Sequence, residues 1–168
     1  VEPDFVIQLD NLFSSISIES FWLMLKSKTG VVEGKLFLQK NISKLVIFEP
    51  GFPGGGSTQF EQLWLEKTLQ NGYSVFLVRH GGTLIQGKFS ESYLNCIKRQ
   101  ELKTTKNLSV LGNKQTHTIA DWLVEPLIAM EVLVPHFSET VLCGHSFGPL
   151  ALIYSLLELV KDEPKLAG

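Results

Sequence analysis

The sequence predicts an α/β fold built on a doubly wound, mostly parallel sheet. Three short runs, over 45–48, 75–78 and 141–143, are continuously apolar, as is typical of strands covered on both faces. A segment with helical spacing of apolar residues follows each run. Strands that alternate with helices in this way indicate parallel pairing with right-handed crossovers, here within one domain over 1–168.

The first predicted elements depart from this pattern and form an antiparallel hairpin over 20–40. Residues 21–27 alternate apolar and other side chains, and 31–38 follow after the turn Lys28-Thr29-Gly30. Alternation with a period of two around a turn that contains glycine is typical of two edge strands. The core then extends over 44–160 in the order strand, helix, strand, helix, strand, helix.

The first predicted helix lies between the runs 45–48 and 75–78. Thr58 and Glu61 have the spacing of a capping box, and Gly72 is a stop signal. Apolar residues at near-helical spacing between these signals predict a helix with one buried face.

Two further helical segments flank the last apolar run. Residues 116–133 have apolar side chains at a period near 3.6, and Pro126 either bends this helix or starts a second one. Residues 151–160 form the third helix. The polar segment 84–112 shows only weak periodicity and is expected to be a long excursion over the active-site edge of the sheet.

Composition and charge exclude several function classes. The 15 Lys and Arg against 17 Asp and Glu give a net charge of −2, and the basic residues are scattered, so neither nucleic acid nor an anionic membrane is an expected partner. No apolar stretch approaches the ~20 residues of a membrane span, and the acidic N-terminal segment does not look like a signal peptide. The first residue is valine, so we expect a chain that is processed, trimmed or cut from something larger.

Two cysteines, Cys96 and Cys143, do not make a disulfide framework. No cysteine or histidine cluster has the spacing of metal ligands, and nothing in the sequence indicates a cofactor. The expectation is therefore a reducing, cytoplasmic setting without a metal site.

The segment with the most specific chemistry is Gly144-His145-Ser146-Phe147-Gly148, which stands between a predicted strand and a predicted helix. A serine in a sharp strand-to-helix turn projects its hydroxyl above the sheet, and the flanking glycines allow close backbone approach. The alternative is a plain glycine-rich turn. In this context the pattern favours a nucleophile at Ser146.

A second glycine-rich loop follows the run 45–48, from Glu49 to Gly56, and includes Pro50-Gly51-Phe52-Pro53. With the serine turn, this loop resembles the α/β-hydrolase superfamily, including its proline iminopeptidase-like enzymes. The resemblance covers residues 21–160. It implies that the backbone N–H groups of Phe52 and Phe147 form an oxyanion hole, and that Gly51, Gly144 and Gly148 shape the loop and the elbow. Pro50 stands where these loops usually carry histidine.

The resemblance also implies a triad acid and a histidine after the serine, and the sequence does not provide them. Asp162 and Glu163 would lie some 20 Å from Ser146 along a helix. No histidine follows Ser146, and His80 is the one earlier histidine at the catalytic edge. We therefore expect a sheet truncated after the helix that follows the elbow, with the triad acid and histidine outside this chain.

Three other interpretations remain open. Arg79-His80-Gly81 resembles the signature of histidine phosphatases, although that family opens its domain with this strand. Residues 51–58 match a phosphate-binding loop except that Ser57 replaces the lysine. An α/β-hydrolase-like module without activity is the third.

The sequence predicts a serine hydrolase that forms an acyl-enzyme at Ser146 on an ester, thioester or peptide-type carbonyl. The expected partners are a small-molecule or peptide substrate and a C-terminal half or another chain that covers the sheet edge at 141–143. On its own the chain is expected to hydrolyse little, because a nucleophile without its base keeps only residual catalysis.

Overall fold

The computed structural model describes residues 18–51, 59–80 and 118–162. The strands are β1 (Ile18–Lys26), β2 (Val31–Gln39), β3 (Lys44–Glu49), β4 (Ser74–Arg79) and β5 (Glu139–Gly144), and the helices are α2 (Gln59–Gln70), α5 (Ile119–Leu123), α6 (Glu125–Leu133) and α7 (Gly148–Asp162), with a 3-10 turn η1 (Val134–His136). The predicted excursion over 84–112 lies outside the described residues.

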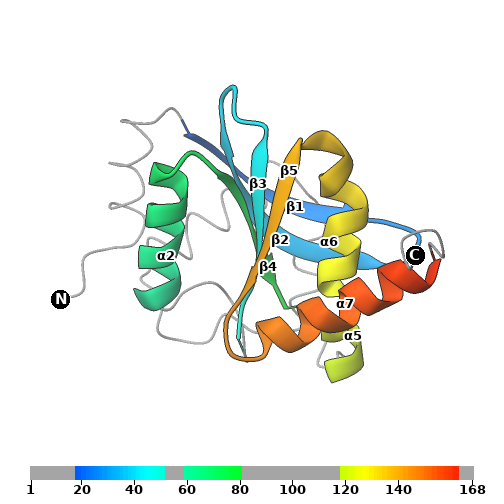
Figure 1. The fold of residues 1–168 in the computed structure, drawn as a ribbon. Coiled ribbons are helices and arrows are strands. Elements are labelled where there is room, and N and C mark those ends of the chain that lie inside the picture. The colour runs from blue at the N-terminus through cyan, green and yellow to red at the C-terminus, as the bar shows by residue number, and fades with distance from the viewer. Residues whose placement is uncertain (1–17, 52–58, 81–117, 163–168) are drawn as a thin grey trace.

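The described strands form one mixed sheet in the order β1-β2-β4-β3-β5 (Figure 1). The hairpin of β1 and β2 is antiparallel, whereas β3 pairs in parallel with β4 on one side and with β5 on the other. The predicted α/β fold with a mostly parallel core is therefore confirmed. Within the described sheet, only β1 of the hairpin is an edge strand, because β2 also pairs with β4, antiparallel.

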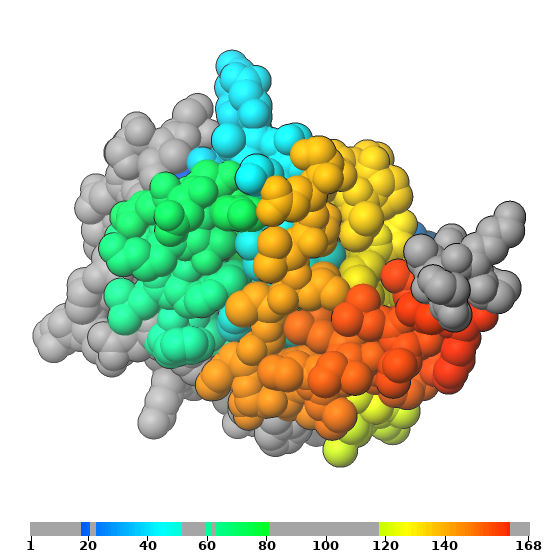
Figure 2. Space-filling view, viewed as in Figure 1, coloured from blue at the N-terminus to red at the C-terminus, as the bar shows by residue number. Residues whose placement is uncertain are grey.

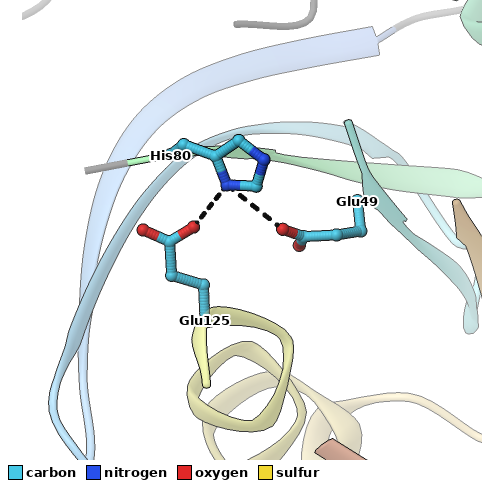
Figure 3. Close-up of side chains that lie close together, drawn as sticks. All are labelled: Glu49, His80 and Glu125. Atoms are coloured by element: carbon cyan, nitrogen blue, oxygen red, sulfur yellow. Dashed lines mark hydrogen bonds and ion pairs between the residues drawn. The ribbon is translucent and has the colours of Figure 1, made fainter. Parts of the chain in front are cut away.

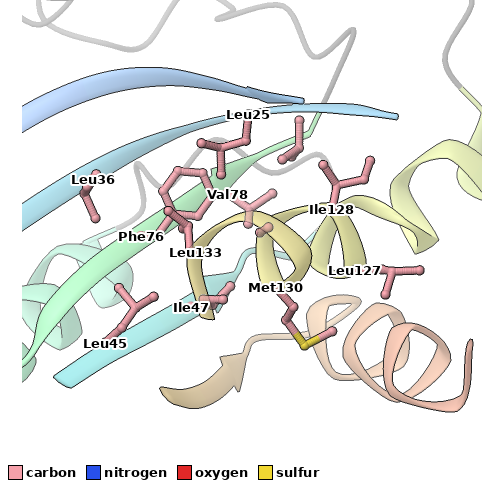
Figure 4. Packing of buried hydrophobic residues seen from close by; sticks show 12 residues of the cluster. Leu25, Leu36, Leu45, Ile47, Phe76, Val78, Leu127, Ile128, Met130 and Leu133 are labelled. Atoms are coloured by element: carbon pink, nitrogen blue, oxygen red, sulfur yellow. The ribbon is translucent and has the colours of Figure 1, made fainter. Parts of the chain in front are cut away.

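Helices cover both faces of the sheet, because the central strands bury side chains alternately on either side. One core cluster packs under α6 and includes Leu45, Ile47, Phe76 and Val78 from β3 and β4 (Figure 4). The other packs under α2 and includes Val46, Phe48, Val75 and Leu77 from the same strands. Continuous apolar runs in β3 and β4 are thus explained by burial on two faces.

The helix boundaries follow local signals. Helix α2 ends at Gln70, and Gly72, two residues later, has a φ of +79°, which favours glycine. Thr118, with Asp121, caps α5, and Pro126 lies in the first turn of α6, so this proline starts a second helix. Thr58 of the predicted capping box lies outside the described residues.

Strand β5 is less buried than its sequence suggests. It lies at the end of the described sheet, and Val141 keeps 41% of its surface exposed. In Figure 2, β5 and α7 both lie on the face turned toward the viewer. We define the open face as β5 together with the exposed apolar side chains of α7, which are Leu150, Ile153, Tyr154, Leu156, Leu157 and Val160. The prediction of a strand buried on both faces is wrong for β5 within the described part of the chain.

Among the described helices, none combines the length and the apolar character that crossing a membrane requires.

Candidate active site at the serine turn

The serine turn joins the end of β5 to the start of α7. The N–H of His145 donates to the carbonyl of Glu49 at 3.1 Å, and the N–H of Gly148 donates to the carbonyl of His145 at 2.8 Å. These bonds close a tight turn in which Ser146 has a φ of +56°. A positive φ is costly for a residue with a side chain, about 1 kcal/mol or more, and it persists only where the surrounding structure imposes it.

The glycines around this turn are sterically required. A Cβ atom on Gly144 would lie 2.7 Å from the backbone of Gly148, and one on Gly148 would lie 2.1 Å from the carbonyl oxygen of Glu49. A Cβ atom on Gly51 would lie 2.8 Å from the Cβ of Ser146. The start of the loop after β3, at Gly51, and the serine turn are therefore in direct contact.

Of the two predicted oxyanion donors, only Phe147 belongs to the described residues. Its carbonyl accepts bonds from Leu150 and Ala151 in the first turn of α7. Its N–H donates to none of the residues that the structure describes. An N–H at a helix N-terminus that is open to a ligand suits a developing negative charge. Phe52 lies outside the described residues.

The Ser146 side chain is exposed, and no described residue forms a hydrogen bond with its hydroxyl. Asp162 ends α7, roughly 20 Å along the helix from the serine turn. His136 lies in η1, which precedes β5 and so lies at the opposite end of this strand from the serine. His117 and Glu163 lie outside the described residues, and His145, adjacent to Ser146, has its ring against that of Phe60, with centroids 5.1 Å apart. Within the described part of the chain, no group is therefore hydrogen-bonded to Ser146 as a base.

His80, the histidine that the sequence places at the catalytic edge, is fully buried. Its Nδ1 lies 2.7 Å from Oε2 of Glu125 and 3.3 Å from Oε1 of Glu49 (Figure 3). We name these three residues the buried carboxylate–histidine cluster. It joins the ends of β3 and β4 to the start of α6, directly beneath the serine turn, whose His145 is bonded to the backbone of Glu49.

Aromatic rings enclose the imidazole. The ring of Trp122 stacks on His80 with centroids 5.1 Å apart, and the ring of Phe147 meets it edge-on at 5.7 Å. Burial, and secondarily the charge of Glu125, raise the pKa of Glu49 well above its ordinary value. His80 is thus adjacent to the serine turn through Phe147, but its Nδ1 is engaged by carboxylates and its ring is closed off from solvent.

Sequence reasoning missed this cluster. His80 and Glu125 are 45 positions apart in the chain, and no short motif links them. A usable signal was present, because Glu49 and His80 each come at or directly after the end of a buried parallel strand, where side chains of neighbouring strands meet at one edge. Within the described residues, this is the one group of histidine, cysteine and carboxylate side chains close enough to share a metal ion.

The side chain of Arg79 points to the other face of the sheet from that of His80. Its guanidinium forms a buried ion pair with Glu33 of β2, with 3.4 Å between Nη1 and Oε2. Successive residues of a strand point to opposite faces of the sheet. Arg79 and His80 therefore do not converge on one ligand position, as a phosphatase signature requires.

Solved structures with the same architecture belong to the α/β-hydrolase fold. A dienelactone hydrolase from Anabaena variabilis matches with a TM-score of 0.53 and 14% identity, over 88% of this chain and 59% of that chain. An esterase from Pyrococcus furiosus matches with a TM-score of 0.56 and 16% identity, over 87% of this chain and 47% of that chain. No family model and no curated protein matches the sequence.

These likenesses show that the chain has an α/β-hydrolase fold, as its motifs predict. They are likenesses of fold, since the identities are low. The chain spans about half the length of the solved structures it matches, 59% and 47% in the two cases above.

Proposed function

We propose that this chain carries the nucleophile of a serine hydrolase that acts on an ester, thioester or peptide-type carbonyl. The observation that carries the proposal is the positive φ of Ser146, +56°, in a turn between a parallel strand and a helix. Serine has no conformational reason to adopt this backbone, and a turn that imposes it presents the hydroxyl at the sheet edge. The exposure of Ser146 is consistent with access by a substrate.

The chemistry follows from the groups around the turn. Oγ of Ser146 attacks the substrate carbonyl carbon while a histidine takes the hydroxyl proton, and the same histidine then protonates the leaving group. The negative charge that develops on the carbonyl oxygen is held by the N–H of Phe147 and by that of Phe52 in the loop after β3. Water then hydrolyses the acyl-enzyme and restores Ser146. We assign the histidine and its carboxylate to sequence beyond the described residues.

The open face indicates that further elements of the domain pack against β5 and α7. In a parallel sheet, an edge strand with unpaired N–H and C=O groups is a template for another strand, and exposed apolar helix faces require cover. We propose that a further strand pairs with β5 and that its helix covers α7, and that both belong to the half of the fold that this chain does not span. Ile153 and Leu157, each 58% exposed, are the most exposed apolar side chains of the surface to be covered.

Phosphoryl transfer at Arg79-His80-Gly81 is not supported by these contacts. His80 is fully buried between two carboxylates, where a phosphate anion would meet like charges. The guanidinium of Arg79 forms a buried ion pair with Glu33. An inactive hydrolase-like module is the remaining alternative, since no group among the described residues is hydrogen-bonded to Ser146 as a base.

Covalent labelling of the full-length protein with a fluorophosphonate tests the proposal. An activated serine reacts with this probe, whereas an ordinary surface serine does not. The proposed enzyme is labelled at Ser146, and an inactive module is not labelled.

A further inference from the structure

The buried carboxylate–histidine cluster has no part in the proposed hydrolysis. All three side chains are almost completely closed off from solvent, with Glu49 and His80 fully buried and Glu125 nearly so. They come from three elements, β3, the end of β4 and α6, and both carboxylates point at the same ring nitrogen of His80 (Figure 3). Burying two carboxylates beside one imidazole, away from water, costs folding free energy unless a positive charge compensates them.

The hydrogen bonds of the cluster do not satisfy Glu49. One ring nitrogen carries at most one proton, and the shorter contact, 2.7 Å, directs it to Glu125. Glu49 is left 3.3 Å from the same nitrogen, and neither of its carboxylate oxygens has a hydrogen-bond partner among the described residues. An orphaned, fully buried carboxylate aimed at two other metal-ligand side chains is the strongest unexplained feature of the described structure.

We propose that Glu49, His80 and Glu125 form a buried site for one divalent transition-metal ion, for which Zn²⁺ is the best match. The three ligand atoms, one imidazole nitrogen and two carboxylate oxygens, lie within 4.8 Å of one another. An imidazole ligand favours zinc and related ions over Mg²⁺ and Ca²⁺, which prefer oxygen alone. A dication also cancels the charges of the two carboxylates beside a neutral imidazole.

The three ligand atoms lie near the spacing that one ion requires, and the carboxylates must move to reach it. Zinc ligands at about 2.0–2.2 Å in a tetrahedral arrangement lie roughly 3.3 Å from each other. The separation between Nδ1 and the Glu49 oxygen is already 3.3 Å, while that between Nδ1 and Glu125 must lengthen from 2.7 Å. Binding of an ion therefore requires a shift of the Glu125 carboxylate away from Nδ1. The second oxygen of Glu49, which also lacks a hydrogen-bond partner among the described residues, belongs to the same carboxylate, so it can add only a bidentate contact that distorts the tetrahedron.

The position of the site indicates a structural role. Trp122 and Phe147 pack against the imidazole and hold its plane. The backbone carbonyl of Glu49 receives the N–H of His145 in the serine turn. An ion at the cluster would therefore fasten β3, β4 and α6 beneath that turn, and because the ligands are buried it would exchange slowly with solvent.

Metal content and thermal unfolding of the purified full-length protein test the proposal. The protein is stripped with a chelator, incubated with Zn²⁺ or, separately, with Mg²⁺, desalted and assayed for bound metal. We expect one zinc per chain, no retained magnesium, and a higher unfolding temperature with zinc than without it. Absence of both zinc retention and the thermal shift would overturn the proposal and leave the three side chains as a network that shares a proton.

Variants locate the ion. Glu49→Gln and Glu125→Gln each remove a ligand charge and should weaken zinc binding by about tenfold or more. Glu139→Gln is the matched control, because this exposed carboxylate of β5 is paired with Lys44 far from the ligands, and its zinc affinity should equal that of the wild type. Glu49→Gln introduces no charge, so the metal-free variant should stay folded. If it is folded and binds zinc as the wild type does, the ion is elsewhere and the proposal is wrong.

Discussion

The backbone carbonyl of Glu49 lies where a side chain on Gly148 would begin. A Cβ atom at residue 148 would approach the carbonyl oxygen of Glu49 to 2.1 Å, far inside van der Waals contact. This approach holds the start of α7 against the end of β3, and it is the reason that the serine turn tolerates only glycine at this position.

Gly148→Ala should therefore destabilise the fold by about 3 kcal/mol or more, because backbone must move to relieve the overlap. Gly72→Ala is a matched control. Gly72 has a φ of +79° and nothing within 4 Å of its Cβ position, so its substitution costs only the backbone term of about 1–2 kcal/mol. Chemical denaturation of both variants measures the difference, and equal losses would show that the contact with Glu49 is not tight.

The open face should make the 168-residue chain associate when it is expressed alone. Leu157→Lys places a charge on this face and should shift the chain toward the monomer in analytical ultracentrifugation. Leu63→Lys changes an equally exposed leucine, 55% against 58%, on α2 at the other side of the sheet. This control should leave association unchanged. A wild-type chain that is monomeric at all concentrations would show that the open face does not drive association.

The buried pair of Arg79 and Glu33 should behave as a structural unit. Removing one member, as in Arg79→Met, leaves the other charge buried and should cost about 3–5 kcal/mol of unfolding free energy. The double variant Arg79→Met with Glu33→Leu should recover most of that loss. A double-mutant cycle measures the coupling. Additive losses would contradict the assignment of Arg79 to Glu33 and reopen a ligand-binding role for the guanidinium.

The raised pKa of Glu49 predicts a pH dependence for the metal-free protein. Because the folded chain holds its proton more tightly than the unfolded chain, the stabilisation is fully present below the ordinary value of 4.5. It is lost as the pH rises from 4.5 toward the higher pKa of the folded state, with a slope of at most about 1.4 kcal/mol per pH unit.

Glu49→Gln should remove this contribution. Denaturant titrations in the presence of a chelator, at several pH values above 4.5, should give a shallower decline of stability for the variant than for the wild type. Parallel curves for the two proteins would mean that Glu49 does not hold its proton in the folded state.

Particular residues show how far sequence reasoning reaches here. The apolar runs of β3 and β4 predict buried parallel strands, because apolar side chains on both faces have one explanation. The tight turn at Ser146 is also predictable, because its flanking glycines have a local steric role. Val141 could not be foreseen as exposed, since its strand has the same apolar character as the buried ones and differs only in having no outer neighbour among the described strands.

The cluster of Glu49, His80 and Glu125 could not be predicted from local sequence patterns. Glu49 ends a strand, His80 follows another strand, and Glu125 starts a helix, so each has an ordinary local interpretation. Only the parallel pairing of β3 with β4 and the packing of α6 over their ends bring the three together. Long-range contacts of this kind leave no periodic signal in the chain.

Covalent labelling of Ser146 is the most direct test of the proposed serine nucleophile. The full-length protein is treated with a fluorophosphonate probe beside its Ser146→Ala and Ser138→Ala variants, and the modified residue is located by mass spectrometry. Ser138 is a suitable control because it is also exposed, lies before β5, and bonds only to Ser43 among the described residues. A nucleophile at Ser146 predicts labelling of the wild type and of Ser138→Ala at Ser146, and none of Ser146→Ala. Equal labelling of the Ser146→Ala variant, or no labelling of the folded wild type, would contradict it.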